Sequence, residues 1–242
     1  MFFKRNKTIE FIHSVPGVAE LMPIIPAKNH KHKWVERALE NFSEVRQNHL
    51  WKHQRTTHIT RCPGIFSLQR HGWILRTWQD IEIETNGDGK TFTWRTPSKI
   101  GEDYVGFHDE SQLAKFFSVW PDNTLRTVIK IQSGWSCIVP NGYYLLEMPV
   151  PLLEDHRFTT VSGYLSKESG PAVLNVQLLW HVLKGKTLIP AGTPIAQYIL
   201  VPKQLPEIVC RDMKPGDKIE LFKLFNGSRW VNNYSELKKL FS

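Results

Sequence analysis

The sequence predicts a mainly β, α+β fold: an antiparallel β-sandwich or a jelly-roll-like barrel, with an N-terminal helix and a short C-terminal helix. Three observations predict it. From about residue 125 onward, short apolar segments follow one another along the chain. The turns between them are rich in proline and glycine, as in Pro140-Asn141-Gly142 and Pro190-Ala191-Gly192. No segment between them has the length of a helix that connects parallel strands, so antiparallel pairing is favoured.

Size and composition are those of a folded protein. The chain has 242 residues, of which 41% are hydrophobic, 22% charged and 12% aromatic. It contains no internal repeat and no glycine-rich linker. We therefore expect a single domain over 1–242, with an N-terminal arm and helix over 1–58, a β-rich core over 59–205 and a C-terminal extension over 206–242.

The N-terminal part predicts an extended arm followed by a helix. Pro16, Pro23 and Pro26 lie within the first 31 residues, in a mixed apolar background, and favour an arm that lies against the fold. From Trp34 to Gln54, apolar residues recur at helical spacing with charged residues between them. No proline interrupts this stretch, which therefore predicts an amphipathic helix.

A hairpin and a short helix are expected next. Ile81 and Ile83 alternate with acidic residues, and Phe92 and Trp94 alternate with polar ones, on either side of the turn sequence in 86–89, Asn-Gly-Asp-Gly. This pattern predicts two paired strands. Asp109 is a suitable N-cap for a helix over 110–117.

The second half of the chain predicts six strands and a final helix. The strands are expected at 127–132, 135–139, 143–148, 158–164, 172–180 and 195–201, and the helix at 235–241. Gln197 lies in the last of these strands. We expect its amide to satisfy backbone groups where the strand enters the fold, because a buried amide needs hydrogen-bond partners.

The charge and hydropathy patterns predict where the protein is located and which kinds of partner it can bind. The formal net charge is +8, and much of the excess lies before residue 80. Such a basic third can attract nucleic acid or another anion. No apolar run is long enough to span a bilayer, and the opening residues lack the features of a signal peptide. We therefore expect a cytoplasmic protein without a membrane partner.

The spacing of histidines and cysteines in the sequence does not predict a metal site. His49 and His53 lie four residues apart on the predicted helix, but no third ligand accompanies them, and His30 and His32 are expected on an exposed basic arm. The three cysteines, Cys62, Cys137 and Cys210, are far apart and fit reduced thiols. Cys137 lies in a strand pattern and is expected to be buried. No metal and no cofactor is predicted.

The sequence shows no complete catalytic constellation. It has no nucleophile elbow and no phosphate-binding glycine loop. We therefore predict no catalytic residue, and whether the protein is an enzyme is left uncertain, leaning toward not. Tryptophans interleaved with arginines can stack on and neutralise a nucleotide or a single strand. The candidate binding residues are Arg61, Arg70, His71, Trp73, Arg76 and Trp94.

Five short motifs follow one another along the chain. They are Arg61-Cys-Pro-Gly64, His71-Gly-Trp73, the strand and turn over 80–89, Leu125-Arg-Thr127 and the stretch 189–195, Ile-Pro-Ala-Gly-Thr-Pro-Ile. Together they resemble the motifs of an uncharacterised family of phage-related and marine bacterial proteins, over about residues 20–202. The resemblance implies a fold and a phage or bacterial origin, and no activity; a phage-encoded protein would be located in the host cytoplasm.

A second resemblance is to the β-fold of dUTPases and dCTP deaminases. Gly192-Thr-Pro-Ile-Ala-Gln197 is similar to the G-x-x-I-A-Q turn that closes that fold, and 140–145 is similar to its upstream strand. The arginine-containing phosphate motif and the aspartate-bearing hairpin of those enzymes are replaced here by 162–166 and 172–180. The resemblance therefore implies the shape without the catalytic residues.

Three functions follow as hypotheses. The first is a non-enzymatic β-rich protein that binds a protein partner, associates with itself or serves in an assembly. The second is a nucleotide-binding or nucleotide-processing protein on a dUTPase-like fold. The third is nucleic-acid binding through the basic N-terminal third.

Overall fold

The computed structural model describes residues 8–37, 40–41, 63–97, 103–113, 119–166, 171–212 and 214. The chain divides into two compact units, Met1–Lys203 and Gln204–Ser242, and all of the strands described below lie in the first unit. The expected C-terminal helix and most of the expected helix over 34–54 lie outside the described residues. The single-domain organisation stays a prediction.

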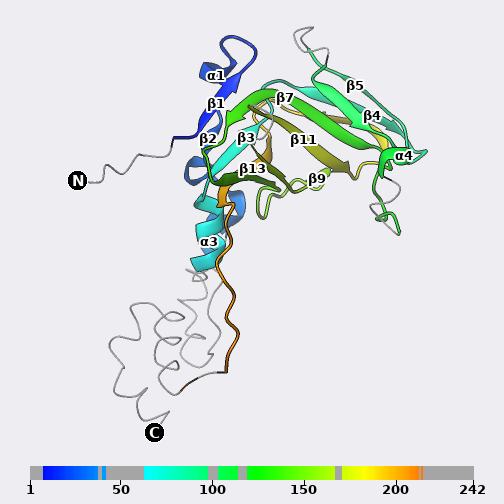
Figure 1. The fold of residues 1–242 in the computed structure, drawn as a ribbon. Coiled ribbons are helices and arrows are strands. Elements are labelled where there is room, and N and C mark those ends of the chain that lie inside the picture. Colours follow the sequence, from blue (N-terminus) through cyan, green and yellow to red (C-terminus); the bar gives the residue numbers. More distant parts are fainter. Residues whose placement is uncertain are drawn as a thin grey trace. The chain divides into compact units, whose positions relative to one another are not determined.

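The described strands form three antiparallel sheets, which confirms the mainly β, sandwich-like prediction. In the first sheet, β7 pairs with β11 along one edge and with β1 and β6 along the other, and β9 continues beyond β11 (Figure 1). The strand order of the second sheet is β10-β8-β13-β3-β2, and that of the third is β12-β4-β5. The described strands do not close into a barrel.

The bounds of the strands are as follows. The first sheet contains β1 (Glu10–His13), β6 (Val105–His108), β7 (Val128–Ile138), β9 (Phe158–Thr160) and β11 (Ala172–Trp180). The second contains β2 (Ile25–Pro26), β3 (Trp73–Arg76), β8 (Tyr143–Met148), β10 (Gly163–Leu165) and β13 (Pro194–Pro202). The third contains β4 (Ile81–Asn86), β5 (Phe92–Arg95) and β12 (Lys184–Ile189).

Helices are short in the described part of the chain. They are α1 (Val18–Leu21), the 3₁₀ helix η1 (Ala27–Asn29), α3 (Pro63–Arg70) and α4 (Glu110–Leu113). Residues 33–37 and 40–41 are also helical, which agrees with the start of the predicted N-terminal helix. None of the described helices is long and apolar enough to cross a membrane.

One apolar core is shared by the three sheets. Alternate residues of each strand point inward, because successive side chains of a strand lie on opposite faces. The first sheet contributes Ile129 and Ile131, the second contributes Leu145, and the third contributes Ile81 and Ile83. Shared burial of these side chains stabilises the sheets together, at roughly 1.5–3 kcal/mol for each large apolar side chain removed from water.

Several predicted elements are confirmed. The hairpin pairs β4 with β5, and in its loop the Asp88 carboxylate accepts hydrogen bonds from the backbone N–H groups of Lys90 and Thr91. The carboxylate of Asp109 accepts bonds from the backbone N–H groups of Ser111 and Gln112 and so caps α4. The N-terminal arm lies against the fold and contributes β1 and β2.

Two strand predictions were wrong. Residues 127–132 and 135–139 were expected as separate strands, but β7 runs through both as a single strand, because Gly134 adopts a positive φ of 76° in a bulge. The strand expected at 158–164 is divided into β9, which pairs with β11, and β10, which pairs with β8. The chain passes from the first sheet to the second at Val161 and Ser162.

Candidate functional site

The predicted binding residues that the structure describes lie on or beside three elements, α3, β3 and β5. Arg61 lies outside the described residues. Arg70 and His71 are exposed at the end of α3, whereas Trp94 lies on β5 in the third sheet.

Two of these residues attach the N-terminal arm. The ring of Trp73 makes an edge contact with Phe11 at 5.7 Å between centroids, and Arg76 Nη2 donates a hydrogen bond to the carbonyl of Pro23 at 3.3 Å. Both residues therefore help to hold the arm against the fold, and their predicted role in binding stays a prediction.

Gln197 behaves as the sequence predicts. Its side chain is fully buried, and Nε2 donates to the carbonyls of Leu68 and His71, at 2.7 Å each. These carbonyls belong to the last turn of α3 and to the residue after it, where helix carbonyls lack partners within the helix. Gln197 therefore joins β13 to the end of α3.

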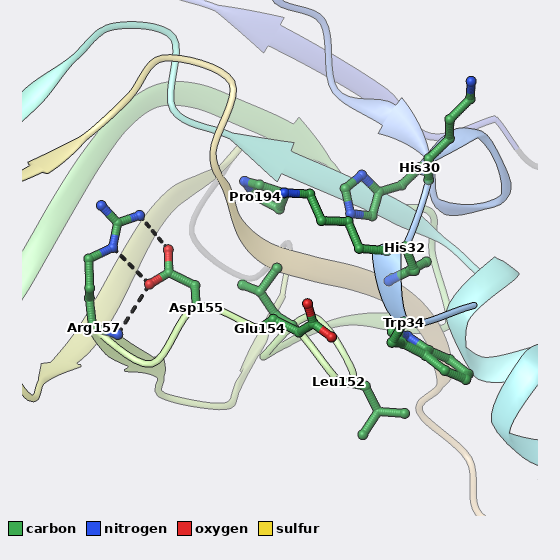
Figure 2. A pocket seen from close by; sticks show the side chains of 11 residues that line it. His30, His32, Trp34, Leu152, Glu154, Asp155, Arg157 and Pro194 are labelled. Carbon is green, nitrogen blue, oxygen red and sulfur yellow. Dashed lines mark hydrogen bonds and ion pairs between the residues drawn. The ribbon is translucent and has the colours of Figure 1, made fainter. Parts of the chain in front are cut away.

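A hollow of about 440 Å³ lies between the N-terminal arm and the loop that follows β8. One wall is formed by residues 30–34, in the sequence His-Lys-His-Lys-Trp, and the other by residues 152–155 with Arg157 and Pro194. Figure 2 shows His30, His32 and Trp34 on one side of the hollow, with Asp155 and Arg157 on the other. We call this hollow the His–Lys cleft.

The acidic side chains of the His–Lys cleft already have cationic partners. Arg157 donates from Nε to Asp155 Oδ1 at 2.8 Å and also from Nη2 to Oδ2, which gives a two-point ion pair (Figure 2). Burial opposes the ionisation of Asp155, but the hydrogen bonds and charge of Arg157 outweigh it, so the pKa of Asp155 is lowered. Glu154 pairs with Arg37.

The lysines of the His–Lys cleft have no such partner. Lys31 and Lys33 are exposed, and no carboxylate of the described residues forms an ion pair with either ammonium group. Since Asp155 and Glu154 are each neutralised by an arginine, the two lysines give the cleft a net positive charge.

Two buried nitrogen atoms of the His–Lys cleft also lack partners. Within the described residues, neither His32 Nε2 nor Trp34 Nε1 makes a hydrogen bond. A buried polar group without a partner costs about 1–3 kcal/mol. The indole N–H is a donor, so it would be satisfied by an acceptor atom of a ligand or a water.

The expected exposure of His30 and His32 was wrong. They were expected on an exposed arm, but both rings are half-buried, and their centroids lie 4.6 Å apart in an edge arrangement. Burial lowers the pKa of both, and for His30 the charges of His32 and Arg76 lower it further. Both rings are therefore mainly neutral at about pH 7.

The loop that forms the second wall contains a strained residue. Leu152 has φ 55°, in the left-handed region that side chains with a Cβ rarely adopt, and its side chain is exposed. Such conformations often occur at binding sites. Nothing in the sequence of this loop, Pro-Leu-Leu-Glu-Asp-His-Arg over 151–157, marks it as part of a site.

A buried acid lies elsewhere, in the second sheet. Glu147 on β8 is 4% exposed, and Tyr198 on β13 donates its hydroxyl hydrogen to Glu147 Oε2 at 2.5 Å. Burial raises the pKa of Glu147 to about 7, although the bond from Tyr198 opposes this shift. The sequence analysis missed this pair, because the two residues are 51 positions apart.

Metal and thiol predictions were tested only in the described residues. These contain no group of three or more His, Cys, Asp or Glu side chains able to hold a metal ion. His49, His53 and Cys62 lie outside them. Cys137 is buried as expected, and burial raises the pKa of its thiol to about 12.

Comparison with known proteins gives little further information. No protein-family model and no curated protein matches the sequence. Among solved structures, a mutant dUTPase from phage phi11 of S. aureus is similar with a TM-score of 0.28 and 12% sequence identity. The similarity covers 55% of this chain and 97% of that chain. A score this low is a weak likeness, so the functional proposal below depends on the His–Lys cleft.

Proposed function

We propose that the protein binds a small phosphate-bearing ligand in the His–Lys cleft, and that a mononucleotide is the ligand that fits it best. The observation on which this depends is the pair of lysines, Lys31 and Lys33, that face a hollow whose carboxylates are already neutralised. An anion that enters the cleft gains favourable interactions with both ammonium groups and meets no unpaired carboxylate.

The rest of the cleft supports a ligand with both an anionic and a planar part. Trp34 contributes an indole ring, which packs against Phe66 at 5.7 Å between centroids and has a free N–H donor. Aromatic rings stack on nucleotide bases with little dependence on the base. The volume of about 440 Å³ lies within the range of small-molecule sites, roughly 300–1,000 Å³.

Calorimetric titration tests the proposal directly. Inorganic phosphate, a series of nucleoside monophosphates and a short oligothymidine are titrated into the full chain at low salt. We expect saturable binding that is tighter for a nucleotide than for phosphate and that weakens as salt screens the lysines. The Lys31→Gln/Lys33→Gln variant should bind at least about 100-fold more weakly, since hydrogen bonds to charged groups contribute about 1.5–3 kcal/mol each.

A matched control separates the cleft from overall charge. Lys28 and Lys184 do not line the cleft, so Lys28→Gln/Lys184→Gln removes the same charge and should leave the affinity unchanged. Equal losses in the two variants would contradict the proposal. Binding confined to the oligothymidine would instead support the nucleic-acid hypothesis, and conversion of a nucleotide would support the nucleotide-processing hypothesis.

A further inference from the structure

We infer that His30 and His32 form a proton-linked anion site, in which the two imidazoles take up protons as the ligand binds in the His–Lys cleft. This inference rests on the proposed function and concerns its regulation by pH. It assigns the imidazoles a different role from that of the lysines, because lysine ammonium groups stay charged throughout the physiological range.

The position of the two rings supports a shared role. They lie edge to face at 4.6 Å between centroids, and both line the cleft (Figure 2). Protonation makes both nitrogens of an imidazole donors. Among the described residues His32 Nε2 has no hydrogen-bond partner, so a protonated His32 would have a donor available to an anion in the cleft.

Burial is the main reason why both rings favour the neutral form before an anion binds. The cations nearby are Lys31 and Lys33, which line the cleft, and Arg76, whose charge further disfavours a proton on His30. On the opposite wall, Asp155 is bonded to Arg157, and Glu154 is paired with Arg37. No carboxylate of the described cleft residues is therefore free to stabilise an imidazolium.

The direction in which the pKa values of His30 and His32 are shifted agrees with this geometry. Burial lowers the pKa of His30 and His32, so the unliganded imidazoles lose their protons below the usual range. A bound anion favours the charged imidazoles and raises both pKa values. Where the bound state holds more protons than the free state, affinity increases as pH falls.

Sulfate is the first probe, because its charge does not change over the pH range in question. We expect its affinity to increase about tenfold from about pH 8 to about pH 5.5, which corresponds to a pKa shift of about one unit on one imidazole. Calorimetry in buffers of different ionisation enthalpy should detect net proton uptake. Histidine ring resonances, assigned with His30→Gln and His32→Gln, should titrate at higher pH when sulfate is bound.

Variants distinguish this inference from the proposed function. His30→Gln/His32→Gln should still bind sulfate through the lysines, but with an affinity that no longer depends on pH. His108→Gln, a control at a half-buried position on β6 outside the cleft, should retain the dependence. Binding that is independent of pH in the unmodified protein, or a pH dependence that survives in the double variant, would overturn the inference alone. Absence of anion binding at every pH would overturn the proposed function as well.

Discussion

Gln197 and Glu147 are the two buried polar residues of the second sheet whose side chains connect separate elements. Gln197 donates two hydrogen bonds to the end of α3, and Glu147 accepts one from Tyr198. Their surroundings differ, since Gln197 remains neutral at every pH, whereas Glu147 has an ionisable carboxyl. Each therefore gives a separate prediction at the scale of single residues.

Replacing Gln197 should destabilise the protein through α3. In Gln197→Leu, the carbonyls of Leu68 and His71 lose the bonds from Nε2, and Leu68 keeps a longer bond from the N–H of His71. We expect the free energy of unfolding to fall by about 2–3 kcal/mol. Urea denaturation measures this change. Gln177→Leu, on the half-exposed side of β11, serves as the control and should change stability by less than about 0.5 kcal/mol. Similar stabilities for the two variants would show that Gln197 does not hold the helix end.

Glu147 should make stability depend on pH. Its folded pKa of about 7 lies above its ordinary value of 4.5, so the folded state holds the proton more tightly than the unfolded state. Stability is therefore highest below about pH 4.5 as far as this group is concerned, and decreases as pH rises through about 7. The full difference is about 3 kcal/mol, at about 1.4 kcal/mol for each unit of pKa.

The Glu147→Gln variant tests this pH dependence, because glutamine resembles the protonated acid. We expect it to be more stable than the unmodified protein at about pH 8 and nearly equal to it at about pH 5, as measured by chemical denaturation at each pH. Glu20→Gln, at an exposed position in α1, should leave the pH profile unchanged. A profile that stays the same in Glu147→Gln would contradict the assignment.

At the scale of elements, the length of β7 depends on the bulge at Gly134. This glycine has φ 76°, and a Cβ built on it would lie 2.9 Å from His13 Nε2 and 3.1 Å from Ser14 Oγ. A side chain at this position would therefore strain the backbone and disturb the pairing of β1 with β7.

Gly134→Ala should lower the free energy of unfolding by about 1–3 kcal/mol, with loss of amide protection in β1 before the rest of the sheet. Hydrogen exchange measures the local effect, and urea denaturation measures the total. Gly163→Ala in β10 is the matched control, since a Cβ there meets nothing within 4 Å and its φ is not positive. Equal effects of the two substitutions would argue against strain at the bulge.

At the scale of the whole molecule, the shared core should protect the thiol of Cys137 from chemical reagents until the sheets unfold together. Its thiol is fully buried among side chains of the core cluster, whereas Cys210 is exposed. Thiolate is the reactive form, and burial raises the pKa of Cys137 to about 12, which further slows its reaction.

Thiol labelling tests this protection. In a Cys62→Ser/Cys210→Ser background, Cys137 should react with a disulfide reagent at least about 1,000-fold more slowly than an unfolded thiol, in line with the unfolded fraction of a marginally stable domain. The rate should rise along the same urea curve as loss of structure. A variant that keeps Cys210 alone should react at once. Rapid labelling of Cys137 without denaturant would show that the core opens locally.

Much of the fold could be predicted because its signals are local. Alternation of apolar and polar residues is sufficient to predict β8, β11 and the β4–β5 hairpin, since side-chain direction in a strand depends only on sequence position. The cap at Asp109 is equally local. By contrast, Gly134 looks like a turn residue in the sequence, and only pairing with β1 and β11 makes it a bulge.

The candidate site could be predicted only in part. The basic stretch Lys28-Asn-His-Lys-His-Lys33 is visible in the sequence and indicates an anion-attracting segment. The opposite wall, which begins at Leu152, follows more than a hundred residues later and has no motif of its own. Of the candidate binding residues with the more obvious spacing, Trp73 and Arg76 lie together on β3, whereas Trp94 lies on β5 in another sheet.

Composition, turn residues and alternation were therefore enough for a β-rich fold with a basic N-terminal part, because each depends on neighbours along the chain. Whether a given charge is paired depends on residues that the folding of the sheets brings close. Asp155 and Glu154 are neutralised by arginines, whereas Lys31 and Lys33 pair with no carboxylate in the part of the chain that the structure describes. This difference gives the His–Lys cleft its positive charge. The pairing of these charges depends on long-range packing, so it could not be predicted from local patterns in the sequence.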